Sequence, residues 1–247
     1  MDELLRNGSI TSKDLVNIGY RRNQLSIFQR LLNKDDFNFY RDLHGIASTQ
    51  HEKILQHFFK ENAWIFGFGL DYRYLSILQD EAHVSEEDAA GRDGAISDFL
   101  LGASNFTVLV ELKLPGTKLF DSRKNRAGSW RLSSELLDSF SQILEQKAGW
   151  QIKSDSREAN YNSEGSAIKQ RTVDPKCILI IGSDRQFDGN EKEKTIKLKT
   201  FELFRRDSRN IEILTYDELF ARANFLVNKE DANKNLINRD AADEVPF

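Results

Sequence analysis

The segment from residue 96 to residue 113, ISDFLLGASNFTVLVELK, constrains the fold more than any other part of the chain. Two apolar runs flank the turn-forming residues GASN, which predicts a buried β-hairpin. In an antiparallel hairpin, the residue numbers of every facing pair add up to the same value. If Asp98 faces Glu111, this sum is 209, which places the centre of the hairpin inside GASN. Because strand side chains alternate with period two, Asp98, Glu111 and Lys113 are expected to share one face.

These three charges in a core hairpin need a physical explanation. Two opposed carboxylates repel each other, and burying one without a partner costs on the order of several kcal/mol. A divalent metal would compensate, since Mg²⁺ prefers carboxylate oxygens together with water and substrate phosphate. Lys113 could then orient or deprotonate an attacking water and offset charge at the phosphate, which is the chemistry of metal-assisted phosphodiester hydrolysis. The alternative is a simple salt bridge between Lys113 and one acid, because short motifs match often by chance.

The length and composition of the chain narrow the class of protein. A chain of 247 residues with 39% hydrophobic side chains can bury one main core plus an accessory segment. The one cysteine, Cys177, excludes a disulfide framework and a multi-cysteine zinc site. No apolar stretch approaches the roughly 20 residues of a membrane span, and the N-terminus lacks the layout of a signal peptide. We therefore expect a cytoplasmic protein without membrane contact.

Hydrophobic periodicity predicts a mixed-sheet α/β fold with helices packed against the sheet. Ser133 or Ser134 is expected to cap the central helix. The predicted helices are 12–33, 49–61, 131–150, 191–207 and 217–227, and the predicted strands outside the hairpin are 72–78, 177–182 and 210–216. Turns or loops are expected at 80–94, 114–130 and 153–174. The predicted organisation is an N-terminal helical segment (1–45), a main domain (46–229) and a polar, frayed C-terminal tail (230–247).

The pattern D98-x12-E111-L112-K113, in the order helix, strand, hairpin, helix, strand, resembles the PD-(D/E)XK nuclease superfamily. The flanking sequence resembles the Shedu anti-phage defence nucleases over about residues 20–227. The resemblance rests on EKILQHFF and NAWIFGFGL, SDFLL, VELK followed by Pro115, a helix containing Gln142, the strand ILIIG and the segment ILTYDELF. It implies an α/β fold with a PD-(D/E)XK nuclease-like mixed β-sheet core flanked by helices and an N-terminal helical segment.

The resemblance also implies roles for single residues. Asp98 and Glu111 would be metal ligands and Lys113 the catalytic lysine. Glu52 would be the acid of the first core helix that completes the metal site, and Gln142 matches a glutamine found on the helix after the ExK motif. Read without the resemblance, Glu52 is a surface helix acid and Gln142 an ordinary polar helix residue.

Two positions depart from the superfamily pattern. Ser97 stands in place of the proline of the name motif, which contributes backbone shape and no ligand. Gln146 stands where some branches have a tyrosine, so no role is assigned to it.

A basic stretch begins at the catalytic lysine. From Lys113 to Arg131, six cationic residues stand against Asp121, which is a net charge of six minus one, or +5. Such a stretch suits contact with a phosphate backbone, and the alternative is a solvated loop. The residues predicted to bind DNA are Lys118, Arg123, Lys124, Arg126 and Arg131. A second basic stretch at 191–207 is diluted by acids, and no motif for base-specific readout is visible.

The resulting prediction is a Mg²⁺-dependent DNA endonuclease of the Shedu type, with Mn²⁺ as a substitute metal. Its implied substrate is double-stranded phage DNA, its implied role anti-phage defence, and its implied assembly a homo-oligomer, dimer or tetramer. Two rival interpretations stay open. One is a DNA-binding or regulatory module on a nuclease-like fold, and the other is a branched-DNA repair nuclease of the same superfamily.

Overall fold

The structure is a computed structural model of the 247-residue chain. It describes residues 12–32, 36–47, 49–67, 76–83, 96–103, 106–125, 128–155, 161–162 and 164–240. The turn of the predicted hairpin, at residues 104 and 105, lies outside these ranges. Arg126, expected to bind DNA, also lies outside them.

The described elements alternate as the hydrophobic pattern predicts, with one small ribbon added. The helices are α2 (Ser12–Leu31), α3 (Phe37–His44), α4 (His51–Glu61), α5 (Ser134–Ser154), α6 (Glu191–Asp207) and α7 (Tyr216–Asp240), with short 3₁₀ helices η2 (Ala63–Ile65) and η4 (Asp184–Phe187). The strands are β1 (Ser76–His83), β2 (Ile96–Gly102), β3 (Phe106–Leu112), β4 (Phe120–Lys124), β5 (Trp130–Leu132), β6 (Arg171–Ile180) and β7 (Ile211–Leu214).

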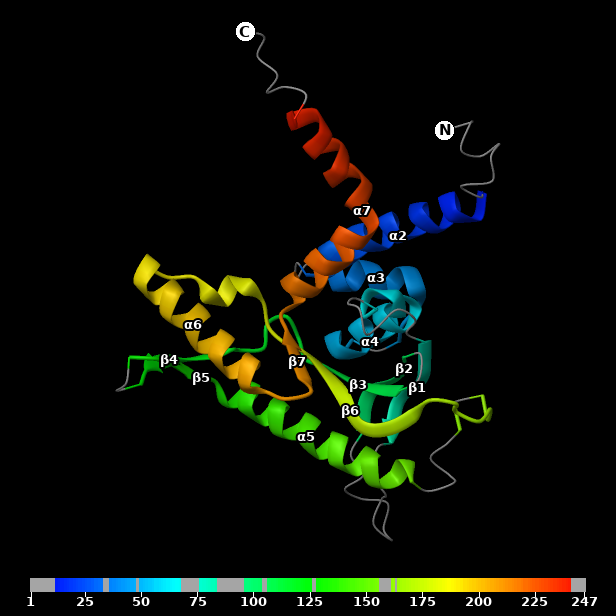
Figure 1. The fold of residues 1–247 in the computed structure, drawn as a ribbon, viewed down its shortest axis with the longest axis horizontal. Helices are drawn as coiled ribbons and strands as arrows, with labels where there is room; N and C mark the ends of the chain where they lie inside the picture. The colour runs from blue at the N-terminus through cyan, green and yellow to red at the C-terminus, as the bar shows by residue number, and fades with distance from the viewer. Residues whose placement is uncertain are drawn as a thin grey trace.

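Five strands form one mixed sheet in the order β1-β2-β3-β6-β7. The β1-β2-β3 part is antiparallel, whereas β3, β6 and β7 run parallel. The helices α2, α3, α4 and α7 lie on one side of this sheet, and α5 and α6 lie on the other (Figure 1). This confirms the predicted mixed α/β plan with helices on the sheet.

Strand alternation divides the core between the two faces. In β3, Val108, Val110 and Leu112 pack with the helices α2, α3, α4 and α7, whereas Leu109 packs with residues of α5 and α6. Glu111 therefore points to the α5 face although it is only 3% exposed. A carboxylate in this position must find its partners on α5 or on the neighbouring strand end.

The predicted bounds of helix α6 and the predicted cap of α5 are confirmed. Helix α6 has the expected bounds, with Asn190 as its N-cap. Ser133 caps α5 by accepting a hydrogen bond from the Leu136 N–H. Cys177 is fully buried, and burial raises the pKa of its thiol to about 12. None of the helices in the described ranges is long and apolar enough to cross a membrane.

Four predictions are wrong in detail. Residues 80–83 belong to β1, where a turn was expected, whereas residues 72–75 of the predicted strand lie outside the described ranges. Residues 120–124 and 130–132, expected as loop, pair as the ribbon β4-β5. The helix predicted at 131–150 begins at Ser134, because β5 occupies the preceding residues, and continues to Ser154. Helix α7 continues to Asp240, beyond the expected end at 227.

Candidate active site

The hairpin has the register that the sequence predicts. Phe99 pairs with Val110, Leu100 with Leu109, Leu101 with Val108 and Gly102 with Thr107, and each pair has an index sum of 209. Continued by one residue, this register would bring Asp98 opposite Glu111. The strand pairing stops at Phe99 and Val110, although both strands continue past it.

Side chains replace the backbone ladder where the pairing stops. One Asp98 carboxylate oxygen, Oδ2, accepts a 2.6 Å hydrogen bond from the Leu112 N–H. The Ser97 hydroxyl donates a 3.0 Å hydrogen bond to the Val110 carbonyl. The Gln56 amide, on α4, donates to the other Asp98 oxygen, Oδ1. Asp98 is thereby fixed between β3 and the first core helix.

Glu111 is bound from both sides of its carboxylate. Its Oε1 accepts a 2.8 Å hydrogen bond from the Lys113 ammonium, and its Oε2 accepts one of 2.8 Å from the Gln146 amide. The same Gln146 amide donates to the Ile96 carbonyl at 2.7 Å. Gln146 is fully buried, and its Oε1 is the buried side-chain atom among the described residues for which no hydrogen-bond partner is found.

Lys113 lies between β3 and α5. Its Nζ donates to Glu111 and also to Oε1 of Gln142, at 2.9 Å. Its backbone is held as well, because its N–H donates to the Ile180 carbonyl at 2.8 Å and its carbonyl accepts a 2.5 Å hydrogen bond from the Tyr216 hydroxyl. The lysine side chain is 22% exposed, so the fixed ammonium still reaches solvent.

The electrostatics of the cluster are dominated by burial. Burial, reinforced by the nearby Glu111, raises the pKa of Asp98 to about 7, and its hydrogen bonds from Leu112 and Gln56 oppose this only partly. Burial, with the carboxylates of Asp98 and Glu52 nearby, also raises the pKa of Tyr216 well above its usual value. The tyrosine therefore stays protonated and serves as a hydrogen-bond donor.

Glu52 is an exposed residue in the first turn of α4, one turn before Gln56. Its negative charge contributes to the raised pKa of Tyr216, so Glu52 lies within electrostatic range of the site. However, no group of three or more His, Cys, Asp or Glu side chains that could hold a metal is found within the described residues. Asp98 and Glu111 lie near each other as a pair of carboxylates, whereas a ligand role for Glu52 stays a prediction.

Sequence reasoning missed three members of the cluster, Gln56, Gln146 and Tyr216. Two of them carried a local signal, because Gln56 lies one turn after Glu52 and Gln146 one turn after Gln142. Tyr216 is brought in by β7 and α7, which no local pattern reveals.

Two of the predicted DNA-binding residues form ion pairs within the protein. Lys124 forms a 3.4 Å ion pair with Glu193 of α6, and Arg131 forms one of 3.5 Å with Asp121. Arg123 is exposed on β4, and Lys118 is exposed before it. The ribbon β4-β5 thus directs two of its cations toward acids of the protein itself.

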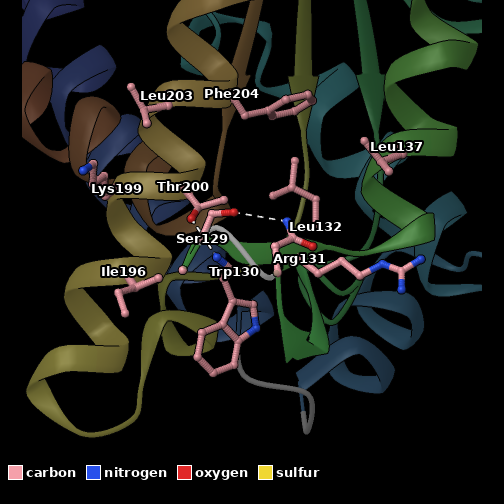
Figure 2. A pocket seen from close by; sticks show the side chains of 12 residues that line it. Ser129, Trp130, Arg131, Leu132, Leu137, Ile196, Lys199, Thr200, Leu203 and Phe204 are labelled. Atoms are coloured by element: carbon pink, nitrogen blue, oxygen red, sulfur yellow. Dashed lines mark hydrogen bonds between the residues drawn. The ribbon is translucent and has the colours of Figure 1, made fainter.

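A hollow of about 670 Å³ lies between this ribbon and α6 (Figure 2). The Trp130 N–H donates a 3.0 Å hydrogen bond to the Thr200 hydroxyl there, which ties β5 to α6. Arg131 and Lys199 line the hollow beside apolar side chains such as Leu203 and Phe204. None of the cluster residues Asp98, Glu111 and Lys113 lines it.

A second groove, of about 1120 Å³, opens next to the cluster in sequence and in the fold. It is lined by Leu31, Leu32, Phe37, His51, Leu114, Pro115, Gly116, Thr117, Lys118, Glu135, Ser183, Arg185 and Gln186. Leu114 directly follows Lys113, and His51 directly precedes Glu52. The groove therefore meets the same ends of β3 and α4 that carry the cluster.

Comparison with known proteins identifies a family for the greater part of the chain. Residues 49–220 match the family model described as "Shedu protein SduA, C-terminal". The Shedu protein SduA of Bacillus cereus (strain B4264) is 29% identical over 178 residues, which cover 71% of this chain and 45% of that protein. The chain thus matches somewhat less than half the length of this curated relative. Asp98, Glu111, Lys113, Glu52 and Gln142 all fall inside the family match.

Proposed function

Because the chain belongs to the family of the Shedu protein SduA, through that family's C-terminal region, we propose that it is a metal-dependent DNA endonuclease that acts in anti-phage defence. The observation that carries the proposal is the placement, at the end of the β2-β3 hairpin, of the Asp98 carboxylate within electrostatic range of the hydrogen-bonded pair of Glu111 and Lys113. The mixed sheet, with helices on both faces, is consistent with a fold of the PD-(D/E)XK type.

The donor set fits a hard divalent cation. Two carboxylates lie close enough that Glu111 raises the pKa of Asp98, and this repulsion is what a cation would relieve. The oxygen of Gln146 without a partner adds a neutral donor of the kind that such cations accept. Asp98 and Glu111 would therefore hold Mg²⁺, or Mn²⁺ in its place. The bound ion supplies Lewis-acid stabilisation of the negative charge that develops on the scissile phosphate.

Lys113 would supply the proton chemistry. Glu111 and the Gln142 carbonyl oxygen accept two of its three N–H groups, which leaves one directed away from both acceptors. This third N–H can donate to the attacking water or to a non-bridging phosphate oxygen. Gln142 and Tyr216 act as positioning residues, because they fix the ammonium and the carbonyl of Lys113.

Cleavage of linear, circular, nicked and branched DNA, each with Mg²⁺, Mn²⁺ or EDTA, tests the proposal. We expect cleavage with either metal, none in EDTA, and none by Lys113→Ala. Lys60→Ala is the matched control, since Lys60 is an exposed lysine of α4 that pairs with Asp80. Because Lys113→Ala leaves Glu111 without its cation, folding is checked by circular dichroism, and Asp98→Asn serves as a second inactive variant.

The outcomes separate the interpretations. Parent-like cleavage by folded Lys113→Ala would refute the assigned site. Binding of every DNA form without turnover would instead indicate a DNA-binding or regulatory module, and a strong preference for branched DNA would indicate a repair nuclease. Assembly into a homo-oligomer is likewise proposed from the family and is tested by light scattering.

A further inference from the structure

We propose that Gln56 is a positioning residue of the metal site, whose side-chain amide holds the Asp98 carboxylate in the orientation in which it binds a divalent cation. The inference rests on the proposed function and concerns the same site. It gives helix α4 a task that is carried out through Asp98, without contact between Gln56 and the scissile phosphate.

One oxygen of Asp98 is fixed by the backbone of the neighbouring strand. The pairing of β2 with β3 stops at Phe99 and Val110, and past that point Oδ2 of Asp98 accepts a 2.6 Å hydrogen bond from the Leu112 N–H. A single hydrogen bond leaves the carboxylate plane free to turn, because the last torsion of an aspartate side chain has a broad energy minimum. The direction of the other oxygen therefore depends on a second donor.

The Gln56 amide is that second donor. Its Nε2 donates to Oδ1 of Asp98, so the two oxygens of this carboxylate are bound from β3 and from α4. The plane of the carboxylate is thereby fixed, while each of its oxygens keeps a further lone pair that can face a cation. Mg²⁺ requires nearly ideal octahedral geometry, so a ligand with a fixed direction suits it.

Helix α4 gives Gln56 a firmly packed backbone. Phe58 and Phe59 of this helix are fully buried, and the centres of their rings lie 5.5 Å and 5.3 Å from the ring centre of Phe28 on α2. Gln56 lies two residues before Phe58 and is itself half-buried. Its position relative to the sheet is therefore set by the packing of α4, and its amide can act as a fixed donor.

An amide suits this task better than a charged donor. It binds the carboxylate without neutralising it, whereas a lysine or arginine in its place would repel a metal cation. Glu111, the second proposed ligand, is bound in a similar way, because its Oε2 accepts a 2.8 Å hydrogen bond from the Gln146 amide of α5. The helices α4 and α5 lie on opposite sides of the sheet (Figure 1). Each carboxylate of the pair is thus held by one glutamine, and the two glutamines come from opposite sides.

The test measures the affinity of the protein for Mn²⁺ from the electron paramagnetic resonance signal of the free ion. Gln56→Met keeps the length of the side chain and removes the donor. We expect it to weaken Mn²⁺ binding about tenfold or more, as is typical when a hydrogen-bond partner of a metal ligand is lost. Gln79→Met is the matched control, since Gln79 of β1 also donates a side-chain hydrogen bond, of 2.7 Å to the Tyr161 carbonyl. This control should change the affinity by less than about twofold.

A double variant separates positioning from a general effect on the fold. If Gln56 acts through Asp98, adding Gln56→Met to Asp98→Asn should change the residual Mn²⁺ affinity by less than about twofold. A purely structural loss would weaken binding by the same factor in both backgrounds. Circular dichroism checks that each variant is folded. If Gln56→Met does not fold, Gln56→Asn takes its place with the same expectation, because its amide is one methylene group shorter.

The inference is overturned if the folded Gln56 variant binds Mn²⁺ like the parent, if Gln79→Met loses as much affinity, or if the loss is equally large in the Asp98→Asn background. Cleavage of DNA by the parent in Mg²⁺, followed in parallel, keeps the two proposals apart. A parent whose Mn²⁺ binding depends on Gln56 but that cuts no DNA would refute the nuclease function and leave the role of Gln56 standing. A parent that cuts DNA while Gln56→Met binds Mn²⁺ equally well would refute the role of Gln56 alone. A parent that binds no Mn²⁺ would refute both.

Discussion

Replacing Asp98 with asparagine should stabilise the metal-free protein at neutral and alkaline pH. The carboxylate is buried and lies beside Glu111, which together raise its pKa from 3.8 to about 7. Asparagine removes the charge and can keep both hydrogen bonds, because its carbonyl still accepts from the Leu112 N–H and the Gln56 amide can rotate to accept from its NH₂ group.

The magnitude follows from the pKa. A rise from 3.8 to about 7 is roughly three units, and at about 1.4 kcal/mol per unit the upper limit of the gain is about 4 kcal/mol above pH 7. The folded state binds the Asp98 proton more tightly than the unfolded state does. The stability that this proton contributes is therefore present below pH 4 and is lost as the pH rises through about 7. Between pH 5 and pH 8, the advantage of Asp98→Asn should grow by up to about 2 to 3 kcal/mol.

Urea denaturation of both proteins in EDTA at pH 5 and pH 8 measures this difference. Asp80→Asn is the control with the opposite sign, because a hydrogen bond from Lys60 lowers the pKa of Asp80. Because that pKa lies below 3.8, the stability contributed by Asp80 is fully present at both pH 5 and pH 8 and is lost only under more acidic conditions, so Asp80→Asn should cost little and by the same amount at both pH values. The reasoning fails if Asp98→Asn destabilises the protein equally at both pH values.

Three further substitutions test the supports of the site. Gln146→Leu removes the donor to Glu111 and Ile96, so we expect about 2 to 3 kcal/mol of lost stability in urea and reduced cleavage; unchanged stability would contradict the assigned hydrogen bonds. Tyr216→Phe leaves the Lys113 carbonyl without its donor, so it should lower the free energy of unfolding by about 1 to 2 kcal/mol. It should also lower kcat more than it raises KM, whereas an effect on KM alone would argue against a positioning role. Gly182→Ala should lower the melting temperature strongly, because Gly182 has a φ of +69° and a Cβ there would lie 2.7 Å from Leu119; a parent-like melting temperature would refute this.

The elements that the sequence predicts well are those whose local pattern agrees with the final packing. The hairpin register was predictable because two apolar runs and one turn cluster fix the pairing, and the observed pairs follow it. Helix α6 was predictable from its amphipathic spacing.

The errors lie where tertiary contacts decide. The ribbon β4-β5 is short and polar, and it is held by the indole N–H of Trp130, which donates to the Asp121 carbonyl at 2.7 Å. The C-terminal part of α7 is rich in polar residues, and the sequence pattern there shows no apolar face that predicts a helix.

The same division applies to the site. Asp98, Glu111 and Lys113 follow from strand register, which is a local property. Gln56 and Tyr216 reach the cluster from α4 and α7, so their contacts depend on how the helices pack on the sheet. The ion pairs of Lys124 and Arg131 could not be predicted from the basic stretch alone, because Glu193 lies on α6, far away in sequence, and the contact of Arg131 with Asp121 depends on the pairing of β4 with β5.

The most direct test of the account is the Mg²⁺-dependent cleavage of closed circular DNA by Asp98→Asn, with the stability of the same preparation measured alongside. The account predicts a variant that is at least as stable as the parent at pH 8 and that cuts no DNA, while Lys60→Ala cuts at the parental rate. Cleavage by Asp98→Asn at the parental rate would contradict the assignment of this carboxylate to a metal-dependent nuclease site.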